Sequence, residues 1–219
     1  MQSLLDSLDL DHHDDVAVFE AVEAAFDLSP ADKGVEWLTV GHVHRAILAR
    51  MPPGDTPGKC ATSMSFYRLR RALAPRVRGP ITPATRLNEA GLTPKDLGPL
   101  LEAETGLQLQ VGAAGWPMML GLLMILAGLL LSVVLRDWRY LLLLPASYLP
   151  LRLDTGDFGR QTVGDLARQA AVANFAALVR DGADHRPDRI WLTLRCAIAE
   201  TIGVKPDRIG PDTRFYPAR

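Results

Sequence analysis

The chain has few of the residues that stabilise small disulfide-bonded proteins or build metal sites. It has only two cysteines, Cys60 and Cys196, which lie far apart and form no CxxC pattern. A reduced, cytosolic setting therefore suits the sequence better than a disulfide framework. The sequence also lacks the P-loop, GxGxxG, HExxH and GxSxG motifs that mark common nucleotide-binding and hydrolytic sites. We expect a protein that is not an enzyme.

The sequence also lacks an excess of charge of either sign, because the formal net charge is −1. Nothing in this balance favours binding to nucleic acid. The average hides a local contrast between the acidic residues 1–32 and the arginine-rich residues 68–78. Patches of this kind are typical of solvated faces and less often of partner surfaces. Residues 1–15 are acidic and have no apolar core, so we expect no signal peptide.

A charge-free apolar run occupies the middle of the chain, from Pro117 to Leu135. As a helix it would span roughly 27 Å, close to the ~30 Å hydrocarbon core of a bilayer. A second apolar run follows from Tyr140 to Leu151. We therefore expect a transmembrane hairpin over residues 116–153.

The hairpin would cross the membrane at about 117–135 and 138–153. The alternative is a single span followed by an interfacial segment. It is favoured by Pro145 and Pro150 in the second run, and by Arg136 and Arg139, which the positive-inside rule would keep in the cytoplasm.

The remaining sequence predicts helices and no strands. Apolar residues recur at three- and four-residue spacing in several segments. We expect helices over 14–26, 37–51, 63–74, 93–105, 162–179 and 188–202, with Thr39 and Thr93 as N-caps. The first is expected to bury Val16, Phe19, Val22 and Phe26, and the last Trp191, Leu194, Ile198 and Ile202. The fold class is therefore all-α.

Two short motifs each occur twice. Ile81–Leu87 (ITPATRL) resembles Ile209–Phe215 (IGPDTRF), and both follow an amphipathic helix. Thr39–Val43 (TVGHV) resembles Thr162–Leu166 (TVGDL), and both open a helix. The order of the motifs along the chain indicates an internal duplication.

These segments resemble the parts of an acyl-carrier-protein fold. In that family, helix I is followed by a loop of the form I-x-P-x-T-x-F. An Asp-Ser-Leu motif then opens an acidic helix II, and helix III begins with a Thr-Val-like cap. Residues 190–215 and 63–87 resemble two copies of helix I and its loop. Residues 14–26 resemble helix II, and Leu38–Gly41 resembles the start of helix III.

The segment Asp9–Asp15 also resembles an uncharacterised bacterial carrier-like membrane protein family that lacks the attachment serine. The resemblance implies small carrier-like helical bundles with an inserted transmembrane helical hairpin. The expected parts are 1–51 (helices II and III), a linker at 52–62, 63–110 (helices I and II), the hairpin, 160–180 (helix III) and 187–219 (helix I, stopping where a helix II would begin).

This order of parts has two consequences. The middle module would be one carrier fold with the hairpin inserted between its second and third helices, which places both chain ends on the cytoplasmic side of the inner membrane. The first and last pieces would complement each other, within one chain or by self-association between two. Remnants of a truncated reading frame are the other explanation of the end pieces.

A working carrier needs a serine at the start of helix II to hold a phosphopantetheine arm, because free N–H groups and the helix dipole favour the phosphate there. The register of residues 14–26 places His12 at that point, and the middle module has Thr93. The literal motif Asp6-Ser7-Leu8 lies about five residues too early. Ser7 is therefore the only candidate attachment site, and no other cofactor is expected.

Other polar clusters have simpler explanations. Residues 11–15 (DHHDD) contain a histidine pair, but adjacent histidines do not share a helix face, so a helix-start charge run is favoured over a metal site. His42 and His44 are expected to be exposed on the second helix, and His185 to be solvated in a polar loop.

The favoured function is a non-enzymatic, membrane-anchored, acyl-carrier-like protein that acts as a docking or regulatory module, with the acidic helix 14–26 as its partner surface. The first alternative is a functional phosphopantetheine carrier that uses Ser7 or a partner chain. The second is a structural helical membrane protein unrelated to carriers. The sequence names no ligand, pathway or partner.

Overall fold

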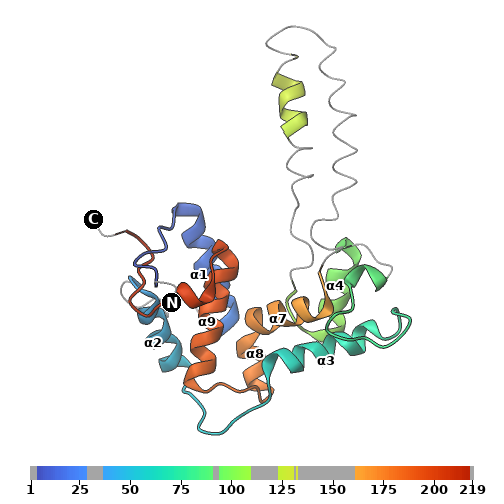
Figure 1. Cartoon of the computed structure of the whole chain (residues 1–219), viewed down its shortest axis with the longest axis horizontal. Helices are drawn as coiled ribbons and strands as arrows, with labels where there is room; N and C mark the ends of the chain where they lie inside the picture. Colours follow the sequence, from blue (N-terminus) through green and yellow to red (C-terminus); the bar gives the residue numbers. More distant parts are fainter. Residues whose placement is uncertain are drawn as a thin grey trace. The chain divides into compact units, whose positions relative to one another are not determined.

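A computed structural model of the chain describes residues 4–28, 37–90, 94–109, 123–130, 132 and 161–217. These parts are helical and contain no strand, so the all-α prediction is confirmed for them. The helices are α1 (His12–Phe26), α2 (Val40–Arg50), α3 (Ala61–Leu73), α4 (Pro94–Thr105), α7 (Val163–Ala173), α8 (Phe175–Arg180) and α9 (Pro187–Ile202), with 3-10 helices at Leu87–Ala90 and Pro206–Arg208 (Figure 1).

Two predicted helix boundaries are wrong. The second helix begins at Val40 rather than Trp37, because Thr39 is extended (φ −132°, ψ 159°) and its hydroxyl caps the helix as predicted. The helix predicted over 162–179 is two helices, α7 and α8, separated by Asn174. The buried Asn174 amide donates to the carbonyl of Ala170 (2.9 Å). Such local side-chain bonds compete with helix propagation.

The chain divides into two compact units. Unit 1 comprises residues 1–68 and 167–219, and unit 2 comprises residues 69–166. Unit 1 is therefore built from the two ends of the sequence, and unit 2 from its middle.

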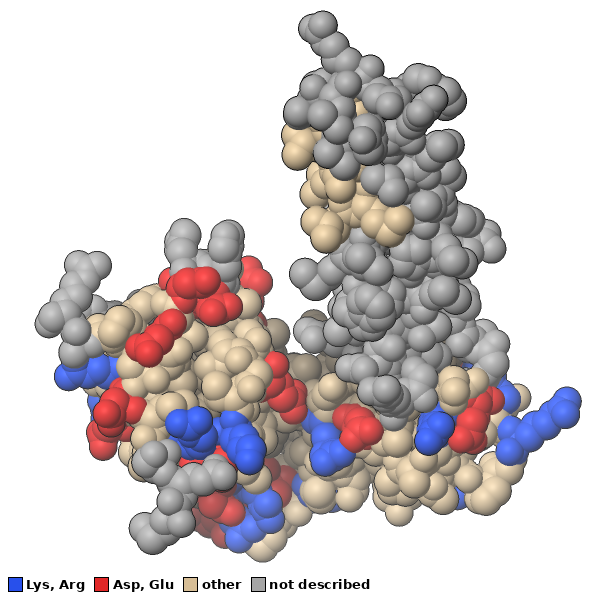
Figure 2. Space-filling view, turned by 45° about the horizontal axis from the view of Figure 1, so that its top comes forward, with Lys and Arg blue, Asp and Glu red and all other residues tan. Residues whose placement is uncertain are grey.

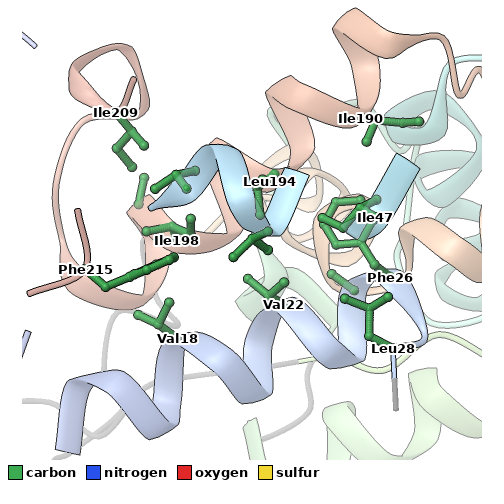
Figure 3. Packing of buried hydrophobic residues seen from close by; sticks show 14 of the residues in the cluster. Val18, Val22, Phe26, Leu28, Ile47, Ile190, Leu194, Ile198, Ile209 and Phe215 are labelled. Carbon is green, nitrogen blue, oxygen red and sulfur yellow. The ribbon is translucent and has the colours of Figure 1, made fainter. Parts of the chain in front are cut away.

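The core of unit 1 lies where α1 packs along α9 (Figure 3). From α1 it buries Val18, Val22 and Phe26, and from α9 Ile190, Leu194 and Ile198. Further members come from α2 and from the loop after α9, with Ile47, Ile209 and Phe215.

One of the predicted stripe positions is wrong, since Val16 is 48% exposed whereas Val18 is fully buried. The predicted Phe19, Trp191 and Ile202 pack against the core but are only partly buried. On α9, Ile190, next to Trp191, is fully buried. The two end pieces of the sequence pack on one another within a single chain, because α1 lies against α9. This is one of the two arrangements that the sequence left open.

The described residues of unit 2 have a core of their own. It is formed by aliphatic side chains from α3, α4, the first turn of α7 and the loops between them: Leu69, Leu73, Val77, Ile81, Leu87, Leu97, Leu101, Leu107, Val163 and Leu166. α4 begins at Pro94 and continues through Gly98 and Pro99.

Most of the predicted hairpin, residues 116–153, lies outside the described residues. Residues 123–130 within it are helical, and Leu123, Leu126 and Leu130 are 62%, 56% and 65% exposed. None of the helices in the described ranges is long and apolar enough to cross a membrane.

Candidate functional site

The two motif types that recur in the sequence bind each other in unit 1. The loop Ile209–Phe215 lies against the first turn of α2, where the N–H of Val40 donates to the Thr213 carbonyl (3.0 Å). The N–H of Gly41 donates to the Pro211 carbonyl (2.8 Å). The N–H groups at the start of a helix have no partner inside the helix, and the loop carbonyls supply one.

Unit 2 repeats this joint with the other copy of each motif. The N–H of Val163 donates to the Thr85 carbonyl (2.8 Å), and the N–H of Gly164 to the Pro83 carbonyl (2.8 Å). The shared geometry extends to the residue before each cap, since Gln161 accepts from the N–H of Leu87 (3.1 Å). The sequence duplication is therefore a duplication of structure.

The equivalent bond in unit 1 joins the Leu38 carbonyl to the N–H of Phe215 (3.2 Å). Both loops also fold on their own threonine: the hydroxyl of Thr213 accepts from the N–H of Gly210 (2.9 Å), and that of Thr85 from the N–H of Thr82 (2.9 Å). Thr213 and Thr85 are both buried.

The glycine that the two helix starts share has a steric reason. A Cβ atom on Gly41 would lie 2.7 Å from the Pro211 carbonyl oxygen, and one on Gly164 would lie 2.8 Å from that of Pro83. These contacts are with backbone atoms, so no side-chain rotation can relieve them. Only glycine lets each loop approach its helix.

An extended segment, residues 4–10, closes the joint of unit 1. Its N–H groups donate to the carbonyls of Arg208, Arg214 and Phe215 (2.8–3.1 Å), and the carbonyl of Asp6 accepts from the N–H of Arg214 (3.0 Å). The Thr213 hydroxyl donates to the Leu5 carbonyl (2.7 Å). We call residues 4–10 the seam, because they connect the loop after α9 to the start of α1.

The candidate residue Ser7 lies in the seam and not at a helix start. It is half-buried, and its hydroxyl oxygen accepts from the N–H of Asp9 (3.0 Å), which has a positive φ of 49°. Ser7 lines a shallow depression of about 520 Å³ between the seam and the loop. Its other walls come from Leu4, Leu5, Asp6, Gly210, Pro211, Asp212, Thr213 and Arg214.

The start of α1 carries no serine. Asp11 caps it, accepting from the N–H of Asp14 at 2.9 Å. His12 is the first residue of the helix, as its predicted place at the carrier serine position requires, but its side chain lies outside the described residues. Thr93, the corresponding residue of the middle module, also lies outside them. A carboxylate therefore sits at the N-terminus of α1, where a carrier would hold phosphate.

A partly exposed apolar surface lies beside the acidic face of α1. Phe19 packs on Trp37 and on Phe215, with ring centroids 5.6 Å and 5.2 Å apart. Exposed Leu38 and Tyr216 adjoin these rings along the chain. We call these five residues and Val16 the aromatic patch.

The rim of the aromatic patch is acidic. The Tyr216 hydroxyl donates to the Asp15 carboxylate (2.8 Å). Burial and then this carboxylate raise the pKa of Tyr216. Exposed Asp14 and Glu20 lie on the same helix.

The other predicted polar positions serve the packing of unit 1. His42 and His44 are half-buried rather than exposed, and His44 meets Trp191 edge-on at 5.0 Å, so burial lowers the pKa of His44. His185 is half-buried beside Gly54 rather than solvated. No group of metal-ligating side chains occurs within the described ranges.

Sequence reasoning missed the ion-pair cluster at Asp184. Arg186 holds both carboxylate oxygens (2.9–3.2 Å) and lowers the pKa of Asp184 to about 2. The N–H of Asp184 also donates to the Lys59 carbonyl (2.8 Å), which fixes the linker after α2. The Asp-x-Arg spacing was visible, but its long-range partner was not.

On the face drawn in Figure 2, basic and acidic side chains are interspersed and form no large field of one sign. No protein-family model, no curated protein and no solved structure matches the chain.

Proposed function

We propose that the chain is a non-enzymatic, membrane-anchored docking protein made of two acyl-carrier-like modules that have lost the attachment serine. The observation that carries the proposal is the start of α1, where Asp11 caps the helix and His12 is its first residue, so that no serine hydroxyl stands there. The twofold occurrence of the loop–helix joint supports a pair of related modules.

The docking surface in this proposal is the aromatic patch with the acidic face of α1. Interfaces are enriched in aromatic anchors with a polar rim, and this patch has both. Leu38 and Val16 are 50% and 48% exposed, so two large apolar side chains of the patch are accessible to a partner. The partner would present apolar side chains flanked by basic ones.

Mass spectrometry tests the loss of the attachment site. The full chain is co-expressed with a phosphopantetheinyl transferase, and we expect its mass to be unchanged. The exposed Ser63 provides a matched control: Ser7→Ala and Ser63→Ala are compared in the same experiment. A serine-linked arm that disappears only in Ser7→Ala would contradict the proposal.

That outcome would establish the alternative function, a working carrier. One observation favours it: Ser7 lines an open depression and is half-exposed, so an enzyme could reach its hydroxyl. Against it stands the extended backbone at Ser7, which provides no helix N-terminus for the phosphate.

Vesicle flotation tests the membrane anchor. The exposed leucines of residues 123–130 would contact lipid, so the double substitution Leu126→Asp with Leu130→Asp should abolish flotation with phosphatidylcholine vesicles. Leu192→Asp, at an exposed position of α9, is the control and should float normally. Flotation of the double variant at the wild-type level would exclude anchoring through this helix.

A further inference from the structure

Three arginines at the end of α3 and just after it have no side-chain partner among the residues that the structure describes. Arg70 and Arg71 are exposed in the last turn of α3, and Arg78 is exposed in the loop that follows. No hydrogen bond or ion pair joins any of the three side chains to another described residue. We call these three residues the basic end of α3.

Their neighbour Arg76 shows what a satisfied arginine in this unit looks like. It donates to the Ala72 carbonyl at the end of α3 (3.1 Å) and pairs with Glu104 on α4 (3.2 Å). Glu104 is therefore paired with Arg76 and does not neutralise the basic end of α3.

Three further carboxylates of unit 2 whose side chains the structure describes also have other partners. Glu89 accepts from the N–H of Arg86 (3.3 Å), and Glu102 from the N–H of Leu109 (2.9 Å). Asp165 accepts from the N–H and the hydroxyl of Thr162 (3.1 and 2.7 Å). None of these carboxylates is used to neutralise the basic end of α3.

Unit 2 is also the unit that contains the apolar run with the exposed leucines of residues 123–130. A unit tethered to a bilayer meets the headgroups at high effective concentration. Guanidinium groups bind phosphate through paired N–H donors, and arginines near an anionic leaflet are attracted to it.

We propose that the basic end of α3 binds anionic lipid headgroups of the membrane to which the chain is anchored. The inference rests on the proposed membrane anchor and specifies the lipid that unit 2 selects. It gives unit 2 a role in orienting the protein on the membrane surface.

The test measures contact between dye-labelled positions and headgroups. A single cysteine is placed at exposed Ala74, just after α3, or at exposed Ala49, near the end of α2 in unit 1, in a Cys60→Ser, Cys196→Ala background. The labelled full chain is bound to vesicles that contain a quencher on the lipid headgroup. The vesicles are phosphatidylcholine alone or with about a third phosphatidylglycerol, the anionic component.

We expect phosphatidylglycerol to increase quenching at position 74 and salt to reverse the increase, with little change at position 49. Replacing Arg70, Arg71 and Arg78 by Gln should lower the contact equilibrium about fivefold for each arginine removed. The matched control replaces three exposed basic residues of unit 1, Arg45, Arg50 and Lys205, by Gln. This variant should leave quenching at position 74 unchanged.

The two proposals fail in different ways. Flotation with phosphatidylcholine but equal quenching at position 74 in both lipids overturns the headgroup contact and leaves the anchor standing. Association only with phosphatidylglycerol, lost in salt and in the Arg70, Arg71 and Arg78 variant, overturns the anchor and supports the headgroup contact. Equal loss of quenching in the two triple variants would also overturn the contact, since general charge would then explain it.

Discussion

Units 1 and 2 build the same loop–helix joint from differently arranged chain segments. In unit 2 the loop Ile81–Leu87 continues directly along the chain towards α4. In unit 1 the loop Ile209–Phe215 is joined to α1 by hydrogen bonds to the seam and by packing of Phe215 on Phe19. The joint therefore depends on the contact between a P-x-T loop and a Thr-Val-Gly helix start, and not on the order of the segments.

The units also differ in the length of the segment that precedes the Thr-Val-Gly helix start. Residues 27–39 connect α1 to α2, whereas residues 106–162 connect α4 to α7 and contain both apolar runs. Yet Gln161 accepts from Leu87 just as Leu38 accepts from Phe215. A long insertion is compatible with this joint because the chain returns to the same hydrogen bond.

The largest difference between the units should appear when the seam is removed. Deleting residues 1–10 removes several hydrogen bonds to the loop and the buried Leu10, so we expect unit 1 to lose about 3–5 kcal/mol of stability. Hydrogen exchange should then quicken in α1, α2 and α9 but not in α4. Leu8→Pro removes one seam donor and provides a milder version, worth about 1 kcal/mol. Unchanged exchange in α9 would show that the seam is dispensable.

Filling the glycine of either joint should have an equal effect on its own unit. Gly41→Val and Gly164→Val each force a side chain against a backbone carbonyl, at an expected cost of about 2–3 kcal/mol. Hydrogen exchange identifies which unit opens in each variant. Gly106→Ala controls for general glycine effects, because no atom lies within 4 Å of its Cβ position, although its φ of +67° adds backbone strain. If Gly41→Val loosened α4 as much as α2, the two joints would not be independent.

A smaller substitution separates the two buried threonines. Thr213→Val removes the acceptor of the Gly210 N–H and the donor to the Leu5 carbonyl of the seam, so we expect the free energy of unfolding to fall by about 2 kcal/mol. Thr85→Val should lower the free energy of unfolding by about 1 kcal/mol. Among the described residues, the Thr85 hydroxyl bonds the N–H (2.9 Å) and the hydroxyl (3.3 Å) of the nearby Thr82 and makes no bond like that of Thr213 to the seam. Urea unfolding of both variants measures the difference. Equal losses would mean that the seam bond contributes nothing.

The sequence could predict what depends on neighbouring residues. The Thr39 cap, the helices and the duplicated motifs all follow from local spacing, and they are present in the structure. The burial of Val18 in place of Val16 depends on where α9 lies, and the break at Asn174 on one side-chain bond. The two motifs were visible as repeats, but their mutual binding joins residues far apart in the sequence.

The candidate site was predictable to the same extent. The absence of serine at the start of α1 follows from the register of the apolar stripe, and the structure places His12 at the first helical position. The position of Ser7 in the seam did not follow, because the seam is held by residues 208–215. Neither did the aromatic patch, since Phe19, Trp37 and Phe215 come from three separate segments.

The smallest expected effect is a pH dependence confined to unit 1. Burial against Trp191 lowers the pKa of His44 below its ordinary value, so the unfolded chain binds this proton at a higher pH than the folded chain does. Unit 1 should therefore lose stability as pH falls through about 6.5, the unfolded pKa, towards the lower folded value. His44→Phe keeps an aromatic ring beside Trp191 and removes the titration, so the decline in its free energy of unfolding between neutral and mildly acidic pH should be shallower. A parallel decline in both proteins would assign the pH dependence to other groups, and unit 2, which contains no histidine, should show none of it.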